Sequence, residues 1–410
     1  MTTPPKTLKE GQGRWLNRTV VGLGTTSLLS DLSHEMGTAI LPSFLTAMGV
    51  SAAALGLIEG VADGVASFVK LASGWLADRT GRRKPIAVGG YFLTGGSTAV
   101  FAFATGWPLV LAGRVAGWFG RGIRTPARNA ILADSVPAES RGKAFGFERA
   151  GDTVGAILGP LIAVGLLGYL HPSASEPSSS FRMIFLLTLI PGFAAGITFA
   201  GLVREFPGRR TKTKFLTSIK NLPGDFRRFL VGVGVFGMGD FAHTLMILAA
   251  TELLVPGRGI SGAAKTAALL YVGHNVIYAG ASYPVGAVSD RLGRRGLLAL
   301  GYLAGTLTAL GFVAAFVWHL SAIPYLLSLF ALGGFYVAFE EALEGSITAD
   351  LVDPAVRGTA YGVLGAVNGI GDVAASVLVG FLWTAVSPAL AFGYAAAMML
   401  AGGVLVYRLR

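Results

Sequence analysis

Long apolar segments follow one another along almost the whole chain, and they restrict its fold more than any other feature. A helix needs about 20 largely apolar residues to cross the ~30 Å hydrocarbon layer of a membrane. The sequence therefore predicts an all-α integral membrane protein with 12 transmembrane helices. The predicted segments are residues 16–47, 52–77, 84–105, 107–131, 142–169, 181–203, 229–254, 264–288, 296–318, 322–346, 357–383 and 386–407.

Composition supports a membrane environment. Charged residues make up 13% of the 410 residues and hydrophobic residues 53%, whereas soluble domains carry about 25% charged residues. The chain has no cysteine, which excludes disulfides, thiolate metal sites and cysteine nucleophiles. The residues before the first segment lack a short apolar core with a small-residue cleavage site. We therefore expect no cleaved signal, and the first segment should remain as a helix.

The basic residues are distributed unevenly along the chain. There are 33 lysines and arginines against 22 aspartates and glutamates, which gives a net charge of +11. Most of the basic residues fall in the termini and in connections that would lie on one side of the membrane. Cytoplasmic loops retain Lys and Arg, so we expect a multi-pass protein of the inner (plasma) membrane with both termini cytoplasmic. The positive charge thus reports topology, and we expect no nucleic-acid partner.

The two halves of the chain repeat each other. The stretch "GWLADRTGRRK" at 74–84 recurs as "GAVSDRLGRRG" at 286–296. The stretch "ILADSVPAESRGKAFG" at 131–146 recurs as "ITADLVDPAVRGTAYG" at 347–362. The two offsets differ by only a few residues, as expected for a duplication with small insertions.

The repeat predicts two six-helix bundles, residues 1–203 and 229–410, joined by a basic cytoplasmic linker at 204–228. Halves related by an axis along the membrane normal are a transporter architecture, in which the substrate site lies near the bilayer midplane between the halves. We therefore expect a small-molecule or ion substrate to bind between the two bundles.

The connection after the second segment, and its repeat, carry the pattern Gly-x-x-x-Asp-Arg-x-Gly-Arg-Arg. In this pattern the chain resembles the major facilitator superfamily, and the resemblance covers essentially its whole length. It implies two pseudo-symmetric bundles, secondary active transport by alternating access, and a monomer. It also implies that the pattern latches the halves together on the cytoplasmic side. The gating residues implied are Gly74, Asp78, Arg79, Gly81, Arg82, Arg83, Asp290, Arg291 and Arg294.

A second motif of the same family lies in segment 142–169. Gly155, Gly159 and Pro160 resemble the helix-five pattern of antiporters, although Ala163 and Val164 stand where the family pattern has further glycines. This resemblance favours efflux over uptake. Glycines four residues apart also form a close helix-packing face, and that interpretation needs no transport direction.

Titratable residues occur in the middle of the apolar segments. The stretch "SDLSHEM" holds Asp31, His34 and Glu35, and "GDFAHTL" repeats it with Asp240 and His243. A charge at the bilayer centre costs about 2.5–3.5 kcal/mol, so it normally faces a cavity and a partner. Desolvation favours the neutral form of a carboxylate, which lets such an acid take up and release protons. We predict proton coupling through Asp31, Glu35 and Asp240.

The predicted substrate site extends these residues. A basic stripe on segment 107–131 contains Arg114, Arg121, Arg124 and Arg128. Arg124 and Arg128 align by the repeat with Glu340 and Glu344, which suggests ion pairs across the halves. The residues predicted to bind substrate are Asp31, His34, Glu35, Arg114, Arg121, Asp240, His243, His274 and Glu340.

Three kinds of substrate remain open at this point. Imidazole and carboxylate ligands suit Fe, Ni, Co or Zn, and a metal site would use Asp31, His34, Asp240 and His243, loosely similar to iron exporters of the ferroportin type. Guanidinium groups suit an anionic solute or a metal chelate. A cluster of aromatic residues could instead form an apolar drug pocket, namely Phe145, Phe147, Phe335, Tyr336 and Phe339.

Catalytic motifs are missing from the sequence. There is no nucleophile elbow and no phosphate-binding Gly-Lys-Ser/Thr loop, and the glycine-rich stretches lie in predicted membrane helices. We therefore expect no enzyme activity and no cofactor, with energy supplied by an ion gradient rather than ATP. A receptor-like membrane scaffold is the non-transport alternative. The expected partners of a transporter are its substrate, protons and the lipid bilayer.

Overall fold

The computed structural model describes residues 15–80, 83–137, 141–170, 178–205, 222–352 and 357–408, and this part of the chain is helical without any strand. We call residues 15–205 the N-terminal half and residues 222–408 the C-terminal half. The N-terminal half contains α1 (Arg18–Ala47), α2 (Ala52–Thr80), α3 (Arg83–Ser97), the 3-10 helix η1 (Thr98–Phe103), α4 (Trp107–Asp134), α5 (Arg141–Tyr169), α6 (Ser179–Leu187) and α7 (Leu189–Leu202). The C-terminal half contains α9 (Gly224–Gly237), α10 (His243–Leu292), α11 (Arg294–Val317), α12 (Ile323–Leu351), α13 (Arg357–Ala385) and α14 (Pro388–Arg408).

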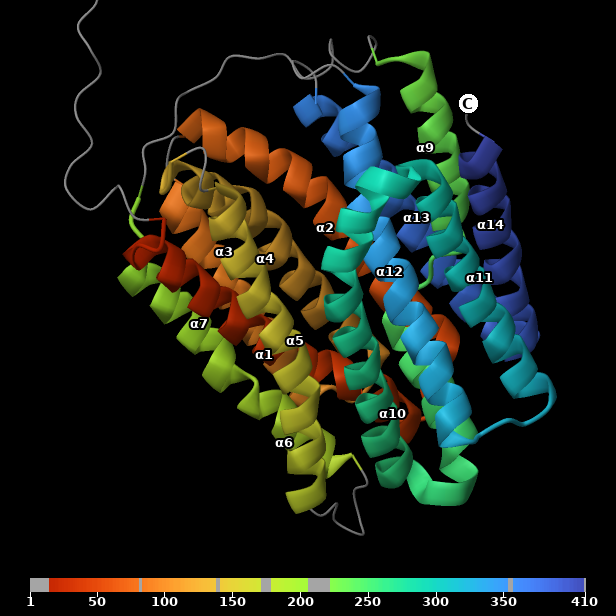
Figure 1. The fold of residues 1–410 in the computed structure, drawn as a ribbon. Coiled ribbons are helices and arrows are strands. Elements are labelled where there is room, and N and C mark those ends of the chain that lie inside the picture. Colours follow the sequence, from red (N-terminus) through yellow and green to blue (C-terminus); the bar gives the residue numbers. More distant parts are fainter. Residues whose placement is uncertain are drawn as a thin grey trace, which may run out of the picture.

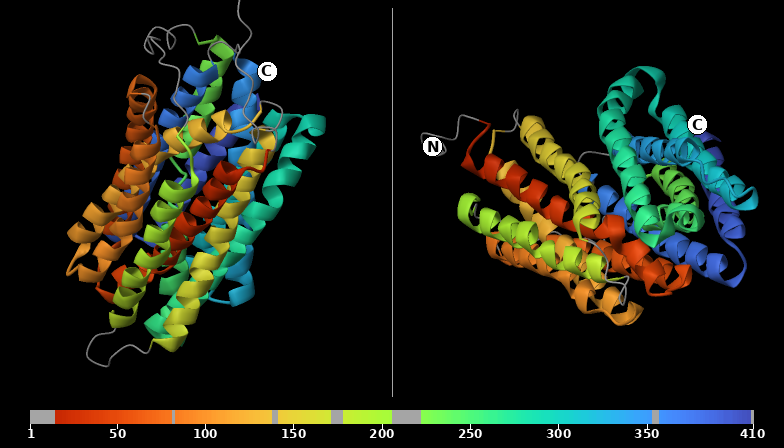
Figure 2. Two further views of the ribbon diagram at one scale, coloured as in Figure 1. Left: turned by 90° about the vertical axis from the view of Figure 1, so that its left-hand side faces the viewer. Right: turned by 90° about the horizontal axis from the view of Figure 1, so that it is seen from below.

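The helices of each half gather on opposite sides of the molecule, as Figures 1 and 2 show. Within the described residues, nine helical stretches are long and apolar enough to cross a membrane. The prediction of an all-α membrane protein is therefore confirmed. Most predicted segments coincide with one helix, while 84–105 is divided between α3 and η1, and 181–203 between α6 and α7.

The predicted segment 229–254 is not one helix, and in this the prediction was wrong. Helix α9 ends at Gly237 and α10 begins only at His243, which leaves Asp240 in an irregular stretch between them. The backbone N–H of Ala242, next to the start of α10, donates a hydrogen bond to the Ser376 hydroxyl at 3.1 Å. A broken membrane helix is tolerated where neighbouring side chains satisfy its free backbone groups.

A second interruption lies inside α10. Gly259 has a φ of 65°, a left-handed conformation that glycine adopts without a steric penalty. The chain reverses there and divides α10 into two arms. The first arm contains the last part of the predicted segment 229–254, and the second arm contains the predicted segment 264–288. Figure 1 shows this reversal at the end of the molecule opposite the C-terminus.

Glycines let α5 approach α1 closely. A Cβ at Gly151, Gly155 or Gly159 would lie 2.3, 2.4 or 2.7 Å from a backbone oxygen of α1. Side chains at these positions would push the helices apart, as in other small-residue membrane interfaces. The packing interpretation of the helix-five glycines is therefore confirmed.

The two halves meet most closely along α2 and α13. A Cβ at Gly56 would lie 2.1 Å from the backbone oxygen of Ser376, and a Cβ at Gly380 would lie 2.6 Å from the backbone oxygen of Ala52. We call this contact of Gly56, Ser376, Gly380 and Ala52 the glycine seam. Because α2 begins and α13 ends near the seam, it closes the interface at the end of the molecule remote from the C-terminus (Figure 1).

Candidate functional site

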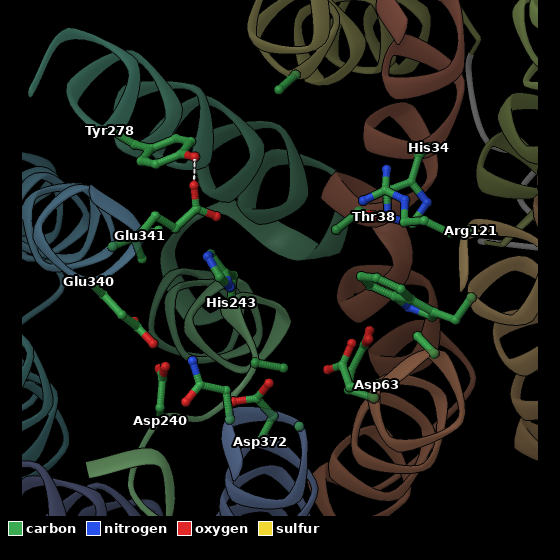
Figure 3. A pocket seen from close by; sticks show the side chains of 18 of the residues that line it. His34, Thr38, Asp63, Arg121, Asp240, His243, Tyr278, Glu340, Glu341 and Asp372 are labelled. Carbon is green, nitrogen blue, oxygen red and sulfur yellow. Dashed lines mark hydrogen bonds between the residues drawn. The ribbon is translucent and has the colours of Figure 1, made fainter. Parts of the chain in front are cut away.

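A cavity of about 670 Å³ lies between the halves (Figure 3). Helices α1, α2, α4 and α5 line it from the N-terminal half, while α10, α12, α13 and the stretch before α10 line it from the C-terminal half. The volume falls within the ~300–1,000 Å³ range of small-molecule sites. Along α2 the lining runs from Glu59 to Lys70, towards the end remote from the glycine seam.

The structure gathers the predicted site residues around this one cavity. All nine residues predicted to bind substrate line it: Asp31, His34, Glu35, Arg114, Arg121, Asp240, His243, His274 and Glu340. Further charged lining residues were not among the predicted site residues: Glu59, Asp63, Lys70, Arg149, Asp152, Glu341, Glu344 and Asp372. The signal that pointed to Asp31, a titratable residue inside an apolar segment, also applied to most of these.

Ion pairs neutralise the charges of the N-terminal half from within. The Arg114 Nε lies 3.0 Å from a Glu59 oxygen, and both side chains are buried. The Arg121 guanidinium donates to Asp31 at 2.6 Å and lies over the face of Trp118, which also stacks with Arg114. A buried charge is tolerated when it has a partner of opposite sign. Each of these two arginines therefore already holds a carboxylate.

The predicted ion pairs across the halves are wrong. Arg124 donates to the Ser30 hydroxyl at 2.7 Å and stacks on Tyr91, and Arg128 pairs with Glu148 at 2.5 Å. The aligned acids of α12 have other neighbours, because α4 and α12 occupy equivalent places in separate halves. The basic stripe of α4 therefore finds its partners inside the N-terminal half.

Neutral donors hold the acids of the C-terminal half. The Tyr336 hydroxyl donates to Asp240 at 3.0 Å. Buried Glu344 accepts from the Tyr302 hydroxyl at 2.5 Å and from the Asn368 amide at 2.7 Å. These oxygens therefore have hydrogen-bond donors, but the donors carry no positive charge.

One acid of this half has a basic partner from the other half. Arg149 on α5 lies 3.2 Å from Glu341 on α12, and the Tyr278 hydroxyl donates to the same carboxylate. Both charged side chains are largely exposed, 60% for Arg149 and 48% for Glu341. This pair links the halves at the edge of the cavity, and Figure 3 shows Tyr278 and Glu341 together.

The histidines contact aromatic rings. His34 packs edge-on against Trp118 with ring centroids 5.6 Å apart, while the His243 and His274 rings are 5.1 Å apart. Asp240 and His243 do not share a helix, because Asp240 precedes α10, which begins at His243. Among the described residues no group of three or more His, Asp or Glu side chains is arranged to hold a metal ion. The metal site stays a prediction without structural support.

The predicted gating residues are described only in part. Gly81 and Arg82 lie outside the described residues, as do the side chains of Asp78, Arg79, Asp290 and Arg291, while Gly74 belongs to α2. Arg83 pairs with Asp134 at 2.6 Å and Arg294 pairs with Asp350 at 2.7 Å. The two acids are repeat mates, so each half has a similar ion pair at the end remote from the glycine seam.

The apolar drug pocket is not formed by the predicted aromatic residues. Tyr336 is buried and bonded to Asp240, and Phe339 packs against Gly301. Phe147 and Phe335 are about two-fifths exposed on the outside of the helices. None of the five predicted aromatics, Phe145 included, is among the described residues that line the cavity.

Comparison with known proteins identifies relatives of the chain. The family model of the Major Facilitator Superfamily matches residues 23–273 and 229–410. An uncharacterised MFS-type transporter of Methanocaldococcus jannaschii is 32% identical over 395 residues, covering 96% of this chain and 95% of the relative. The quinolone resistance protein NorA of Staphylococcus aureus is 27% identical over 176 residues, which is 43% of this chain and 42% of NorA.

Solved transporter structures share the fold. A peptide transporter POT in complex with alafosfalin has a TM-score of 0.76 at 16% identity, covering 97% of this chain and 95% of that chain. A bacterial homologue of the lysosomal transporter Spinster has a TM-score of 0.71 at 18% identity, with 95% and 94% coverage. These likenesses agree with the match of the family model and with the two-halved arrangement around a central cavity. The chain belongs to the major facilitator superfamily.

Proposed function

We propose that this protein is a secondary active transporter that exports a small solute in exchange for protons. The cavity between the halves carries the proposal, because carboxylates of both halves face it and no aqueous solvent would reach them elsewhere in a membrane. Asp31, Glu35 and Asp240 are the proposed proton-coupling residues. Protons, a small solute and the lipid bilayer are the proposed partners of a monomer.

The ion pair of Asp31 and Arg121 supplies a mechanism for coupling. While Asp31 is ionised, it holds the Arg121 guanidinium at 2.6 Å. Protonation of Asp31 would remove the charge that holds Arg121, so the guanidinium would become free to contact other groups in the cavity. A proton taken up at Asp31 therefore changes the charges that a solute meets.

Alternating access follows from the packing of the halves. The glycine seam closes the interface at one end, and the cavity lies on the other side of it. With both termini in the cytoplasm, as the distribution of basic residues predicts, the closed end is extracellular. The transport cycle would then break the seam and bring together the ends that carry Arg83 and Arg294.

Two features favour export over uptake. The partial antiporter pattern at Gly155, Gly159 and Pro160 is one. The similarity of part of the chain to NorA, a quinolone resistance protein, is the other. Direction in an antiporter is set by the proton gradient, so the same site serves export when the gradient is inward.

Transport by purified protein in proteoliposomes tests this function. Asp31→Asn should abolish solute movement driven by a pH gradient, because the side chain can no longer exchange a proton, while solute counterflow should survive. Asp225→Asn, an exposed acid on α9, is the control and should transport normally. Undiminished pH-driven transport by Asp31→Asn would reject Asp31 as a coupling residue.

A further inference from the structure

The basic and acidic residues that line the cavity are divided unevenly between the halves, because the N-terminal half contributes both kinds and the C-terminal half only acids. Among the described lining residues, every Lys or Arg comes from the N-terminal half: Lys70, Arg114, Arg121 and Arg149. The C-terminal half contributes acids alone: Asp240, Glu340, Glu341, Glu344 and Asp372. The cavity therefore has one wall whose charge is wholly negative.

Pairing removes most of the positive charge from the opposite wall. Arg114 is held by Glu59, Arg121 by Asp31 and Arg149 by Glu341. An anionic solute would have to displace a carboxylate from a buried arginine, which leaves that carboxylate unpaired and is costly. The arginines are therefore poor sites for an anion in this conformation.

Four acidic side chains of the cavity have no basic partner in the described part of the chain. Asp63, Asp240, Glu340 and Asp372 line the cavity, and none has an ion-pair partner within 4.0 Å in the described part of the chain. Figure 3 shows the four side chains around the same space, Asp63 from α2 and the other three from the C-terminal half. We call these four residues the acidic face.

Several buried polar atoms of the cavity residues have no hydrogen-bond partner in the described part of the chain; besides N–H groups of Trp118 and Arg121, they include oxygens that can accept from a donor. One oxygen of Glu35, Oε2, is buried and has no hydrogen-bond partner, and the residue is only 9% exposed. The Thr244 hydroxyl, on a residue that is 2% exposed, is likewise without a partner. Both residues line the cavity. Leaving a buried polar group unbonded costs about 1–3 kcal/mol, which a donor on a bound solute would recover.

Aromatic rings next to these groups favour a cation as well. Tyr271 and His274 stack with ring centroids 5.6 Å apart, and His243 packs edge-on against His274. All three rings line the cavity. Aromatic faces attract ammonium and guanidinium groups, which are also hydrogen-bond donors.

We propose that the cavity binds an organic cation, a solute with an ammonium or guanidinium group placed against the acidic face. This inference rests on the proposed transport function and names its substrate class. The positive group would lie against Asp240, Glu340, Asp372 and Asp63, and the remainder of the solute beside the Tyr271 and His274 rings. A cation at the acidic face competes with protons for the same carboxylates, which is the exchange that an antiporter requires.

Binding to the purified protein in detergent tests the substrate class without any transport step. The cationic probes are agmatine, spermidine and tetraethylammonium, the anionic probe is succinate, and glucose is the neutral control, each measured by thermal shift and isothermal titration calorimetry. We expect at least one cation to raise the melting temperature and bind, with no response to succinate. Glu340→Gln and Asp372→Asn should each weaken binding of that cation about tenfold or more.

The control variant is Glu252→Gln, an acid of the same half that is not among the cavity residues; it should bind as the wild type does. Binding of succinate alone, no response to any cation, or cation binding that both variants leave unchanged would each overturn the substrate class. If a variant fails to fold, binding of the cationic, anionic and neutral probes to the wild-type protein still tests the substrate class. Intact proton coupling through Asp31 would leave the transporter proposal standing in all of these cases.

Discussion

Replacement of Gly56 by alanine should loosen the glycine seam. The new Cβ would lie 2.1 Å from the Ser376 oxygen and 3.1 Å from the Gly380 Cα, both backbone atoms that no side-chain rotation can move away. Ordinary van der Waals contact begins at 3.4 Å. To reach it from the 2.1 Å contact with the Ser376 oxygen, α2 and α13 must separate by about 1.3 Å. Overpacking of this kind costs about 1–3 kcal/mol.

The cost is specific to the conformation in which the seam is closed. The ratio of closed to open molecules at this end should therefore fall about 5- to 150-fold. The absence of cysteine from the chain allows spin labels on cysteines introduced at exposed Ser51 and Val386, beside the seam. We expect double electron–electron resonance to show a longer mean distance between the two spin labels, or a new population at long distance, in Gly56→Ala.

Gly165→Ala is the matched control, because a Cβ there meets nothing within 4 Å. Alanine in a helix interior is otherwise favoured over glycine by about 1 kcal/mol, so this variant should melt at the same temperature as the wild type or higher. A Gly56→Ala variant with the melting temperature and label distances of Gly165→Ala would refute the steric reasoning.

Two ion pairs should respond differently to loss of one partner. Glu59→Gln leaves Arg114 buried without its carboxylate and should destabilise the protein by about 3–5 kcal/mol, measured as a lower melting temperature in detergent. The double variant Glu59→Gln with Arg114→Met should recover part of this stability. If the losses of the two single variants simply add, the pairing is contradicted. Arg149→Ala removes an exposed pair with Glu341, so the free energy of unfolding should change by less than about 1 kcal/mol. Because that pair links the halves, solute counterflow should still change in rate, and a counterflow rate equal to that of the wild type would show that the pair has no role in the cycle.

Most helices could be predicted because a membrane demands a long apolar stretch for each crossing. The exception, the segment holding Asp240, looked continuous because apolar residues predominate on both sides of the break. At the break, the backbone N–H of Ala242 donates to the Ser376 hydroxyl of α13. A partner more than a hundred residues away leaves no periodicity in the segment itself.

The gathering of the predicted site residues has a simple cause. Charged groups avoid lipid, so titratable residues in apolar helices of a two-halved bundle turn towards the cavity between the halves. The partners of those residues were not predictable in the same way. Repeat alignment suggested Arg128 with Glu344, but Arg128 pairs with Glu148, since helix packing within one half decides which groups come within reach.

The sequence by itself determined that this chain is helical, lies in a membrane, consists of two related halves and carries acids where lipid would exclude them. These properties follow from segment length, composition and repetition, which are written locally along the chain. Only the tertiary structure decided which carboxylates pair with an arginine and which face the cavity without a basic partner. That distinction depends on distances of a few ångströms between helices far apart in sequence, because ion pairs form only where packing brings opposite charges into contact.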